Sequence, residues 1–465
     1  MPEPDASQQL AESGVTPPTD AMPPTAQPPV IPPPLPAPPQ RGLPPWAIVA
    51  LCAAGVVMFL VIGLLTVGLL TAAKFKAKGV AQVRTAAEAR QTRSRQAVGS
   101  GAREAGFGAG VTYTNVTIAR VPWSIHVLEV ERSRKDLAFY AAHARGKVLG
   151  VSLIGEQART VPREMGRALA GVNGDFYVRD DPSYAGDPRG LQIVNGELIS
   201  APDTFSVCFD ADGNPHLDEV KADFSVTWPD GRKTRFGLNE QRRRRMSVLY
   251  TSTYDTSTRV RGGRDLILEK DGEGPWLPLQ AGETYRARVR EVRIDGNTRL
   301  AADTMVLSLA PDLLASVPEV APGAVLQIST ATTPDLKGVK SAIGGGPALI
   351  QDGKTFSQKR PPPGTSGDWS ERSKYERHPR SAVGWSPTHV YLVTVDGRQP
   401  GLSEGMKLAE LAEFMAGLGC TEAMNLDGGK SAQMWMNGRI MNSPCQGEDT
   451  VANSLLVVRK AAGRL

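Results

Sequence analysis

Hydrophobic and polar positions alternate in short segments over most of the chain that follows residue 110. The clearest segments are 111–119, 124–131, 147–155, 205–214 and 389–397. They are rich in β-branched residues or alternate with a period of two, which is typical of strands. Tight-turn sequences such as DADGN and VDGR end two of them. The pattern therefore predicts a strand-rich fold, with further strands over residues 205–335.

Helical periodicity is rarer and is strongest over residues 403–419. Ser403 suits the first turn of a helix, and Gly419 suits its end. The apolar positions of this segment fall on one helical face; they are Leu408, Leu411, Ala412, Met415 and Leu418. A weaker helix is predicted over residues 162–171. Together these elements predict an α+β class, a strand-rich single domain over residues 111–465 with one or two helices packed on a sheet.

Residues 46–73 contain no charged side chain. About 20 apolar residues are enough to cross a bilayer as a helix. The segment is too long, and begins too far from the first residue, for a cleaved signal peptide. It predicts a transmembrane helix that anchors the chain to a membrane.

Two polar segments flank this apolar stretch. Sixteen of the 37 prolines fall within residues 1–45, which predicts a disordered, extended tail. This tail is either a solvated tether or a docking site for a protein that reads proline-rich sequences. Residues 74–110 are rich in Ala, Arg, Gln and Lys and end in several glycines, so they predict a basic helical stalk followed by a linker.

The formal net charge of +5 is modest for 465 residues and does not indicate a nucleic-acid partner. A run of four arginines, residues 242–245, is interpreted as a solvated loop, with contact to an anionic polymer as the alternative. The four cysteines form neither a disulfide framework nor a zinc pattern. Cys420 and Cys445 flank a candidate loop and either bridge or remain free thiols. No cofactor is predicted; several Asp-Gly turns suit calcium but equally suit ordinary turns.

The candidate loop is NLDGGKSAQ, residues 425–433, which resembles the end of a phosphate-binding P-loop. A P-loop requires glycine where Met424 stands, and a helix precedes this loop while a strand is predicted after it. ATP binding is therefore excluded. Asp427 followed by two glycines instead places a carboxylate at a strand end that a ligand can approach closely. The alternative is an ordinary hairpin turn.

Four other segments share this character. They cover residues 171–177, residues 342–354, the stretch that carries His378 and Arg380 and ends at Gly384, and residues 393–405. Each alone could be a turn. Taken together they place carboxylates, arginine and bare backbone at several strand ends, which is how sugar and phosphate pockets are commonly built.

The ordered motifs resemble those of the phosphodiester glycosidase family. They are NGDFY at 173–177, GGGPALIQDG at 344–353, HPRSAVG at 378–384, VDGR at 395–398 and LDGGKS at 426–431. The resemblance extends over about residues 171–458. Three residues depart from the family pattern: Asp175 replaces a small residue, Tyr177 replaces phenylalanine, and Lys430 replaces a third glycine. Lys430 leaves the exact substrate open.

The resemblance implies cleavage of a sugar–phosphate bond at the anomeric carbon, a reaction that usually employs two carboxylates. Asp427 is expected to pair with Asp175 or Asp396 as acid/base or nucleophile, while Arg380 holds the phosphate. The other predicted substrate-binding residues are Asn173, Gly345, Gly346, His378, Arg398, Asn425, Gly428, Gly429, Lys430 and Ser431.

Three functional classes remain open at this stage. The first is a membrane-anchored hydrolase acting on cell-envelope or exported glycoconjugates, and the second is a module that binds a cell-envelope glycopolymer without cutting it. The third is a cytoplasmic membrane protein of structural purpose, since the basic residues 74–84 favour the cytoplasmic side. Long domains translocate despite such charge, so a single-pass protein with an extracytoplasmic catalytic domain is favoured.

Overall fold

The computed structural model describes residues 110–118, 121–357 and 372–461. The predicted tail, transmembrane helix and almost all of the basic stalk lie outside these residues. Among the residues described, no helix is both long and apolar enough to cross a membrane. The described part is strand-rich with few helices, as the sequence pattern predicts.

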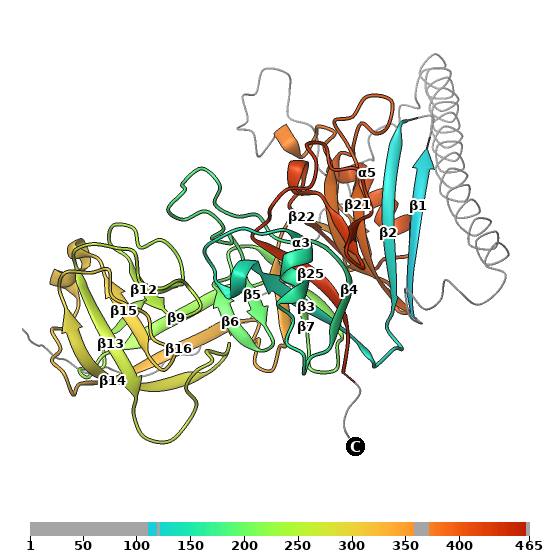
Figure 1. Ribbon diagram of the computed structural model, residues 1–465. Coiled ribbons are helices and arrows are strands. Elements are labelled where there is room, and N and C mark those ends of the chain that lie inside the picture. The colour runs from blue at the N-terminus through green and yellow to red at the C-terminus, as the bar shows by residue number, and fades with distance from the viewer. Residues whose placement is uncertain (1–109, 119–120, 358–371, 462–465) are drawn as a thin grey trace, which may run out of the picture. The chain divides into compact units, whose positions relative to one another are not determined.

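A seven-stranded antiparallel sheet carries most of the predicted motifs (Figure 1). Its strands, in spatial order, are β1 (Val111–Ile118), β2 (Trp123–Glu131), β21 (His389–Val395), β20 (Arg380–Trp385), β22 (Glu422–Leu426), β18 (Ala348–Gln351) and β19 (Lys354–Thr355). Strands β20, β21 and β22 are almost entirely buried, because one face of the sheet packs on the other sheets and the opposite face packs on the helix at residues 408–417.

Two five-stranded sheets contribute to the same hydrophobic core. One comprises β24 (Arg439–Ile440), β23 (Met434–Met436), β4 (Arg167–Asn173), β25 (Asn453–Arg459) and β3 (Leu137–His143). The other comprises β6 (Glu197–Ser200), β5 (Gln192–Val194), β17 (Ser341–Gly344), β7 (Phe205–Phe209) and β8 (Pro215–Glu219). Buried Val172, Ile343 and Leu426 belong to one core cluster, so all three sheets pack against one another.

Residues 221–333, where the sequence predicts further strands, form an eight-stranded sheet. Its core cluster also includes Leu198 and Ala342 of the second five-stranded sheet. Its strands are β10 (Lys233–Arg235), β9 (Lys221–Thr227), β16 (Val325–Thr333), β14 (Thr284–Arg293), β13 (Arg264–Lys270), β15 (Met305–Leu309), β12 (Ser247–Tyr250) and β11 (Gly237–Leu238). Buried Phe224 of β9 and Tyr285 of β14 alternate with more exposed residues along their strands, whereas β12 and β15 are buried throughout.

The predicted C-terminal helix is present as α5 (Leu408–Gly417), and its apolar face is buried as expected. It begins later than predicted. Ser403 does not start it, because the Ser403 hydroxyl donates to the Asp396 carbonyl (2.6 Å) and accepts the Ser124 N–H (3.1 Å). Glu410 instead accepts the Lys407 N–H at the first turn.

Two predicted elements are wrong. Residues 162–171 do not form a helix, since β4 begins at Arg167 and its remaining residues are buried between β23 and β25. Residues 147–155 do not form a strand; they form a loop that leads into the short helix α3 (Ile154–Arg159). Both segments contact neighbours distant in sequence, and that packing overrides their local pattern. Three short 3₁₀ turns complete the described helical structure: η1 (Ala144–Gly146), η2 (Pro311–Ser316) and η3 (Gly429–Ser431).

The arginine run and the cysteines also differ from simple expectation. Arg242 is buried rather than solvated, and it donates to Ser308 Oγ and the Gly262 carbonyl, both at 2.7 Å. Arg244 is 91% exposed, so only part of the run is solvated. Cys420 and Cys445 are free thiols, so the alternative of a bridge is not realised.

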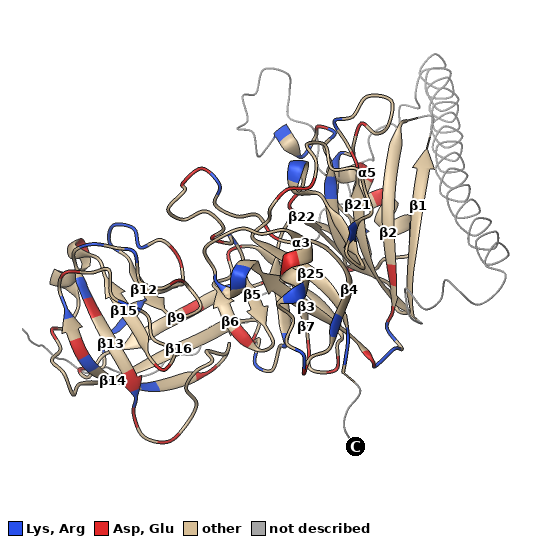
Figure 2. Cartoon of the chain, in the orientation of Figure 1, with Lys and Arg blue, Asp and Glu red and all other residues tan. Residues whose placement is uncertain are grey.

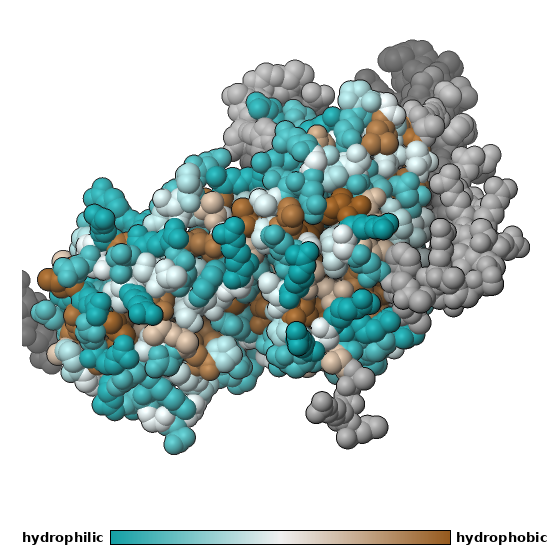
Figure 3. All heavy atoms as spheres, viewed as in Figure 1, coloured by the Kyte–Doolittle hydropathy of each residue, from teal (hydrophilic) through white to brown (hydrophobic). Residues whose placement is uncertain are grey.

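Charged side chains of both signs are interspersed along the described elements (Figure 2). In the face shown in Figure 3, hydrophilic residues predominate and apolar residues lie between them.

Candidate active site

A cavity of about 570 Å³ brings together residues from all five predicted motifs. The predicted residues that line it are Gly346, His378, Arg380, Arg398, Asn425, Asp427, Gly428, Gly429 and Lys430. They come from segments separated by up to 84 positions along the chain. The predicted convergence of distant turns into one cleft is therefore present.

Strand pairing explains this convergence. β20 pairs with β21 through Arg380 and Val395, and with β22 through Ser381 and Leu426. Because both pairings are antiparallel, the start of β20 lies beside the ends of β21 and β22. Residues just after β21 and β22 therefore lie next to Arg380.

Asp427, directly after β22, is the carboxylate that faces the cavity. Its backbone N–H donates to the Gly174 carbonyl (2.9 Å), and its carbonyl accepts the Asn173 side chain (2.7 Å). Its Oδ1 accepts the Gly428 N–H (2.9 Å), and its side chain is 16% exposed. Burial raises the pKa of Asp427, against opposing contributions from Ser431 and Arg179. A carboxyl group with a raised pKa at a cavity wall is suited to proton transfer.

Asp175 lies outside the lining of the cavity and is buried. Its two carboxylate oxygens accept the N–H groups of Phe176 and Gly190, each at 2.7 Å. A Cβ atom added to Gly344 would lie only 2.6 Å from Asp175 Oδ2, so the glycine backbone closes over this carboxyl. Burial raises the pKa of Asp175 to about 7, and the charge of Asp427 adds to the rise while the two backbone bonds oppose it.

Asp396, the alternative partner for Asp427, also lies outside the cavity lining. Its Oδ2 lies 2.9 Å from His126 Nε2. Its Oδ1 accepts the Asn442 side chain (3.0 Å) and the Ser443 N–H (2.9 Å). This buried carboxyl therefore connects β2, the end of β21 and the segment after β24.

Arg380 lines the cavity, but most of its hydrogen bonds go to backbone carbonyls. Its Nε donates to Met406 (2.8 Å), and Nη2 donates to Glu376 (3.0 Å) and to Ser373. Burial lowers the pKa of Arg380 to about 10, and the nearby charge of Arg398 adds to the decrease. Arg380 thus brings positive charge to the cavity while it fixes residues 373–376 in place.

His378 and Arg398 form a second basic group at the cavity. His378 Nδ1 lies 3.2 Å from Arg398 Nη2, and His378 Nε2 lies 3.3 Å from a Glu376 carboxylate oxygen. Burial lowers the pKa of His378, and the charges of Arg380 and Arg398 lower it further. The imidazole is therefore neutral at pH 7, and the two arginines carry the positive charge.

The remaining predicted residues support the cavity from behind. Asn173 accepts the Ser381 hydroxyl (2.6 Å) and the Gln433 N–H (3.1 Å), so it ties β4 to β20 and to the loop after β22. Gly345 donates its N–H to the Phe205 carbonyl, and Ser431 accepts a hydrogen bond from Arg179.

Asn425 lines the cavity, and its side chain donates to the Gly346 carbonyl (2.8 Å). Its Oδ1 is buried and has no hydrogen-bond partner among the residues that the structure describes. A buried acceptor of this kind is available to a donor on a ligand.

Sequence reasoning missed Arg179, which is central to the site. Its guanidinium lies 4.5 Å from the centre of the Tyr177 ring, and its Nη2 lies 3.6 Å from Asp427 Oδ2. Its Nη1 lies 4.0 Å from Asp449 Oδ2, which in turn lies 3.3 Å from Lys430 Nζ. The available signal was proximity, since Arg179 follows the NGDFY motif by two positions. The other lining residues missed are Phe176, Tyr177, Asp180, Arg189, Pro347, Ser373, Lys374 and Leu408.

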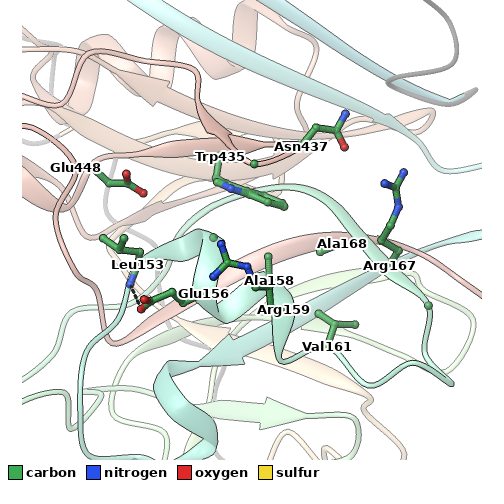
Figure 4. A pocket seen from close by; sticks show the side chains of 13 residues that line it. Leu153, Glu156, Ala158, Arg159, Val161, Arg167, Ala168, Trp435, Asn437 and Glu448 are labelled. Atoms are coloured by element: carbon green, nitrogen blue, oxygen red, sulfur yellow. Dashed lines mark hydrogen bonds between the residues drawn. The ribbon is translucent and has the colours of Figure 1, made fainter.

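A larger cavity, of about 790 Å³, lies between α3, β4 and β23 (Figure 4). Trp435, Ala158 and Val161 form apolar parts of its wall, while Arg167 and Glu448 contribute charge. It contains none of the predicted site residues. Volume alone therefore does not identify the active site, and the chemistry of the lining residues does.

Within residues 110–118, 121–357 and 372–461, no group of three or more His, Cys, Asp or Glu is arranged to hold a metal ion. The expectation that no cofactor is needed stays a prediction.

Comparison with known families supports the resemblance that these motifs carry. Residues 294–458 match the model of a family described as phosphodiester glycosidase. The resemblance to this family is confirmed. The match includes the motifs from residue 344 to residue 431, while NGDFY at 173–177 precedes it. No curated protein matches the chain.

Solved structures show that the fold occurs in other proteins. A hypothetical protein from Synechocystis is 18% identical with a TM-score of 0.59, and the match covers 75% of this chain and 62% of that one. A candidate exported protein from Burkholderia pseudomallei is 22% identical with a TM-score of 0.53 and 75% coverage of both chains. The catalytic domain of zebrafish N-acetylglucosamine-1-phosphodiester alpha-N-acetylglucosaminidase, auto-inhibited by its pro-peptide, is 14% identical with a TM-score of 0.39; the match covers 75% of this chain and 82% of that one.

Proposed function

We propose that this chain is a glycoside hydrolase that cleaves a sugar-1-phosphodiester. The observation that carries the proposal is the position of Asp427, which lies within the family match and faces a cavity whose charged side chains are mostly basic. A carboxyl group beside arginines suits a sugar bonded through its anomeric carbon to a phosphate.

In the proposed reaction, water adds across the bond between the anomeric carbon and the phosphate-linked oxygen. The carbon–oxygen bond breaks, the sugar leaves as a free reducing sugar, and the phosphate stays on the aglycone as a monoester. A phosphate is a good leaving group, so positive charge from Arg179 and Arg380 replaces much of the work of a general acid. Asp427 then acts as the acid/base or nucleophile at the sugar.

Asp175 lies behind the cavity wall, and we propose that it influences the ionisation of Asp427. Two nearby carboxylates resist simultaneous ionisation, so a proton held on Asp175 favours the charged form of Asp427. Asp396 is proposed only as a positioning residue for the end of β21, since its oxygens are occupied by His126, Asn442 and Ser443.

The test is direct. The full-length chain is incubated with the methyl phosphodiester of N-acetylglucosamine 1-phosphate, and free reducing sugar is measured against heat-denatured protein. Release of N-acetylglucosamine together with methyl phosphate is expected. Retention on a phosphate-containing glycopolymer without any release would overturn the hydrolase proposal and support the alternative of a non-catalytic glycopolymer-binding module.

We further propose that the chain is a single-pass membrane protein whose hydrolase domain faces the outside of the cytoplasm and acts on cell-envelope or exported glycoconjugates. Residues 46–73 support the anchor, and the description of the Burkholderia pseudomallei neighbour as a candidate exported protein supports the orientation. Protease added to intact cells should remove the hydrolase domain. Protection of the domain in intact cells, with cleavage only after lysis, would contradict this orientation.

A further inference from the structure

The basic side chains that line the cavity differ in how far they are exposed to solvent. Asp427 has a side chain that is only 16% exposed and Arg380 is buried, whereas the Lys430 side chain is 45% exposed. Arg189 and Arg398 are also exposed. The reacting bond, which must meet Asp427, therefore lies inside a rim formed by three exposed bases. This rim is defined by Arg189, Arg398 and Lys430.

The described lining carries more positive charge than a single phosphodiester needs. Six of its side chains are basic (Arg179, Arg189, Lys374, Arg380, Arg398 and Lys430), whereas two are acidic (Asp180 and Asp427). Asp449, just outside the lining, is shared by Lys430 and Arg179. A phosphodiester carries one negative charge, so it leaves part of this positive charge without compensation.

The two arginines beside His378 show the same surplus. Arg398 is a cause of the lowered pKa of Arg380, and both arginines are causes of the lowered pKa of His378. The nearest described contact of Arg398 is the imidazole of His378, which is not an acid. Like charges placed this closely cost free energy in the empty site, and a second anion would relieve that cost.

We infer that the preferred aglycone carries a second phosphate beyond the reacting one, and that Arg398 and Lys430 at the rim bind it. This inference rests on the proposed hydrolase function and narrows its substrate class. Both a sugar linked to a diphosphate and a sugar at the end of a phosphodiester-linked polymer present this chemistry. Lys430, where the family pattern has glycine, supplies a charge that the unsubstituted motif would lack.

The experiment compares three substrates that share the same sugar: the methyl phosphodiester, a nucleoside diphosphate sugar, and an oligomer with repeated phosphodiesters. For the full-length protein, kcat/KM should be at least about 10-fold higher for one of the last two than for the methyl phosphodiester. Which of the two is preferred identifies the source of the second phosphate.

Variants at the rim test whether Lys430 and Arg398 cause the preference for a second phosphate. Lys430→Gln and Arg398→Gln should each bring the ratio of kcat/KM between the preferred and the methyl substrate toward one. Arg167→Gln is the matched control, because it removes the same charge at the other cavity and should leave the ratio unchanged.

The outcomes separate the two proposals. Equal kcat/KM for all three substrates would overturn the second-phosphate site and leave the hydrolase proposal standing. A preference that survives both rim variants would also overturn it. Absence of cleavage of every substrate would overturn the hydrolase proposal, and the inference built on it.

Discussion

At the scale of single residues, the proposal depends most on Asp427. Its carboxyl group lines the cavity and has a pKa raised by burial. Hydrogen bonds with Gly174 and Asn173 fix its backbone. Asp427→Asn keeps the size and one hydrogen-bond acceptor of the side chain but removes its charge and proton. We expect kcat on the methyl phosphodiester to fall by about 10²–10⁴-fold.

The control for this substitution is Asp352→Asn, which makes the same change in an exposed turn where the backbone has a positive φ of 50° that asparagine tolerates. Its activity should stay within about 2-fold of the parent protein. Circular dichroism checks that both variants fold. Full activity of a folded Asp427→Asn protein would contradict the role assigned to this carboxyl.

At the scale of elements, the backbone of a residue with a buried acid group, Asp187, pairs with the segment that carries Arg179. Asp187 is buried, its carbonyl accepts the Val178 N–H (2.9 Å), and burial raises its pKa to about 8 with an added contribution from Glu240. In the unfolded chain the pKa of an aspartate is about 3.9. The folded state therefore binds the extra proton between these two values.

This difference predicts the direction of a pH effect. The contribution of Asp187 to stability is fully present below about pH 4 and is lost as pH rises to about 8, at up to about 1.4 kcal/mol per pH unit. Urea unfolding from pH 5 to pH 8 should show the free energy of unfolding of the parent protein declining relative to that of Asp187→Asn. The exposed Asp335→Asn variant is the control. Parallel curves for the parent and Asp187→Asn would contradict the prediction.

Substitutions in and near the helix α5 test its packing against the seven-stranded sheet that carries the site. Leu411 is fully buried against the seven-stranded sheet, whereas Leu402, just upstream, is 42% exposed. Leu411→Ala should lower the free energy of unfolding by about 2–5 kcal/mol, because it leaves a cavity in the core. Leu402→Ala should change it by less than about 0.5 kcal/mol. Comparable losses in denaturant unfolding would show that α5 does not pack as described.

The same elements show what the sequence could and could not predict. The apolar face of α5 and the strands β1, β2, β7 and β21 follow from local periodicity, which is strong there. The convergence of motifs from residue 344 onward follows from strand ends and the family resemblance. These signals are local, or they depend on residue types at fixed spacing.

The missed features depend on contacts across the sequence. The segment of β4 resembles a helix locally because it contains two alanines, which favour helices. Its pairing with β23 and β25 makes it a buried strand instead. Asp396 resembled a site acid, yet its partner His126 is 270 positions away. Arg179 lies in a segment without periodicity, and its position follows from Tyr177 and Asp427. Local patterns carry no information about such partners.

At the scale of the whole molecule, the formal charge of +5 is spread among residues of both signs (Figure 2). The field that attracts a phosphodiester should therefore come from the bases that line the cavity rather than from the surface as a whole. The Debye length falls from about 14 Å to about 4 Å between 0.05 M and 0.5 M salt, so exposed rim bases lose most of their reach.

We expect kcat/KM for the methyl phosphodiester to fall by roughly 2–10-fold over this range of salt, because electrostatic attraction of the anion weakens. An uncharged aryl glycoside of the same sugar, where it is cleaved, should show little change. Lys430→Gln should reduce the salt dependence, since it removes an exposed charge at the cavity. Arg244→Gln, which removes a charge that is 91% exposed and bonded to Asp312, should leave it unchanged. An equal effect of both variants would assign the attraction to the net charge of the molecule and not to the rim.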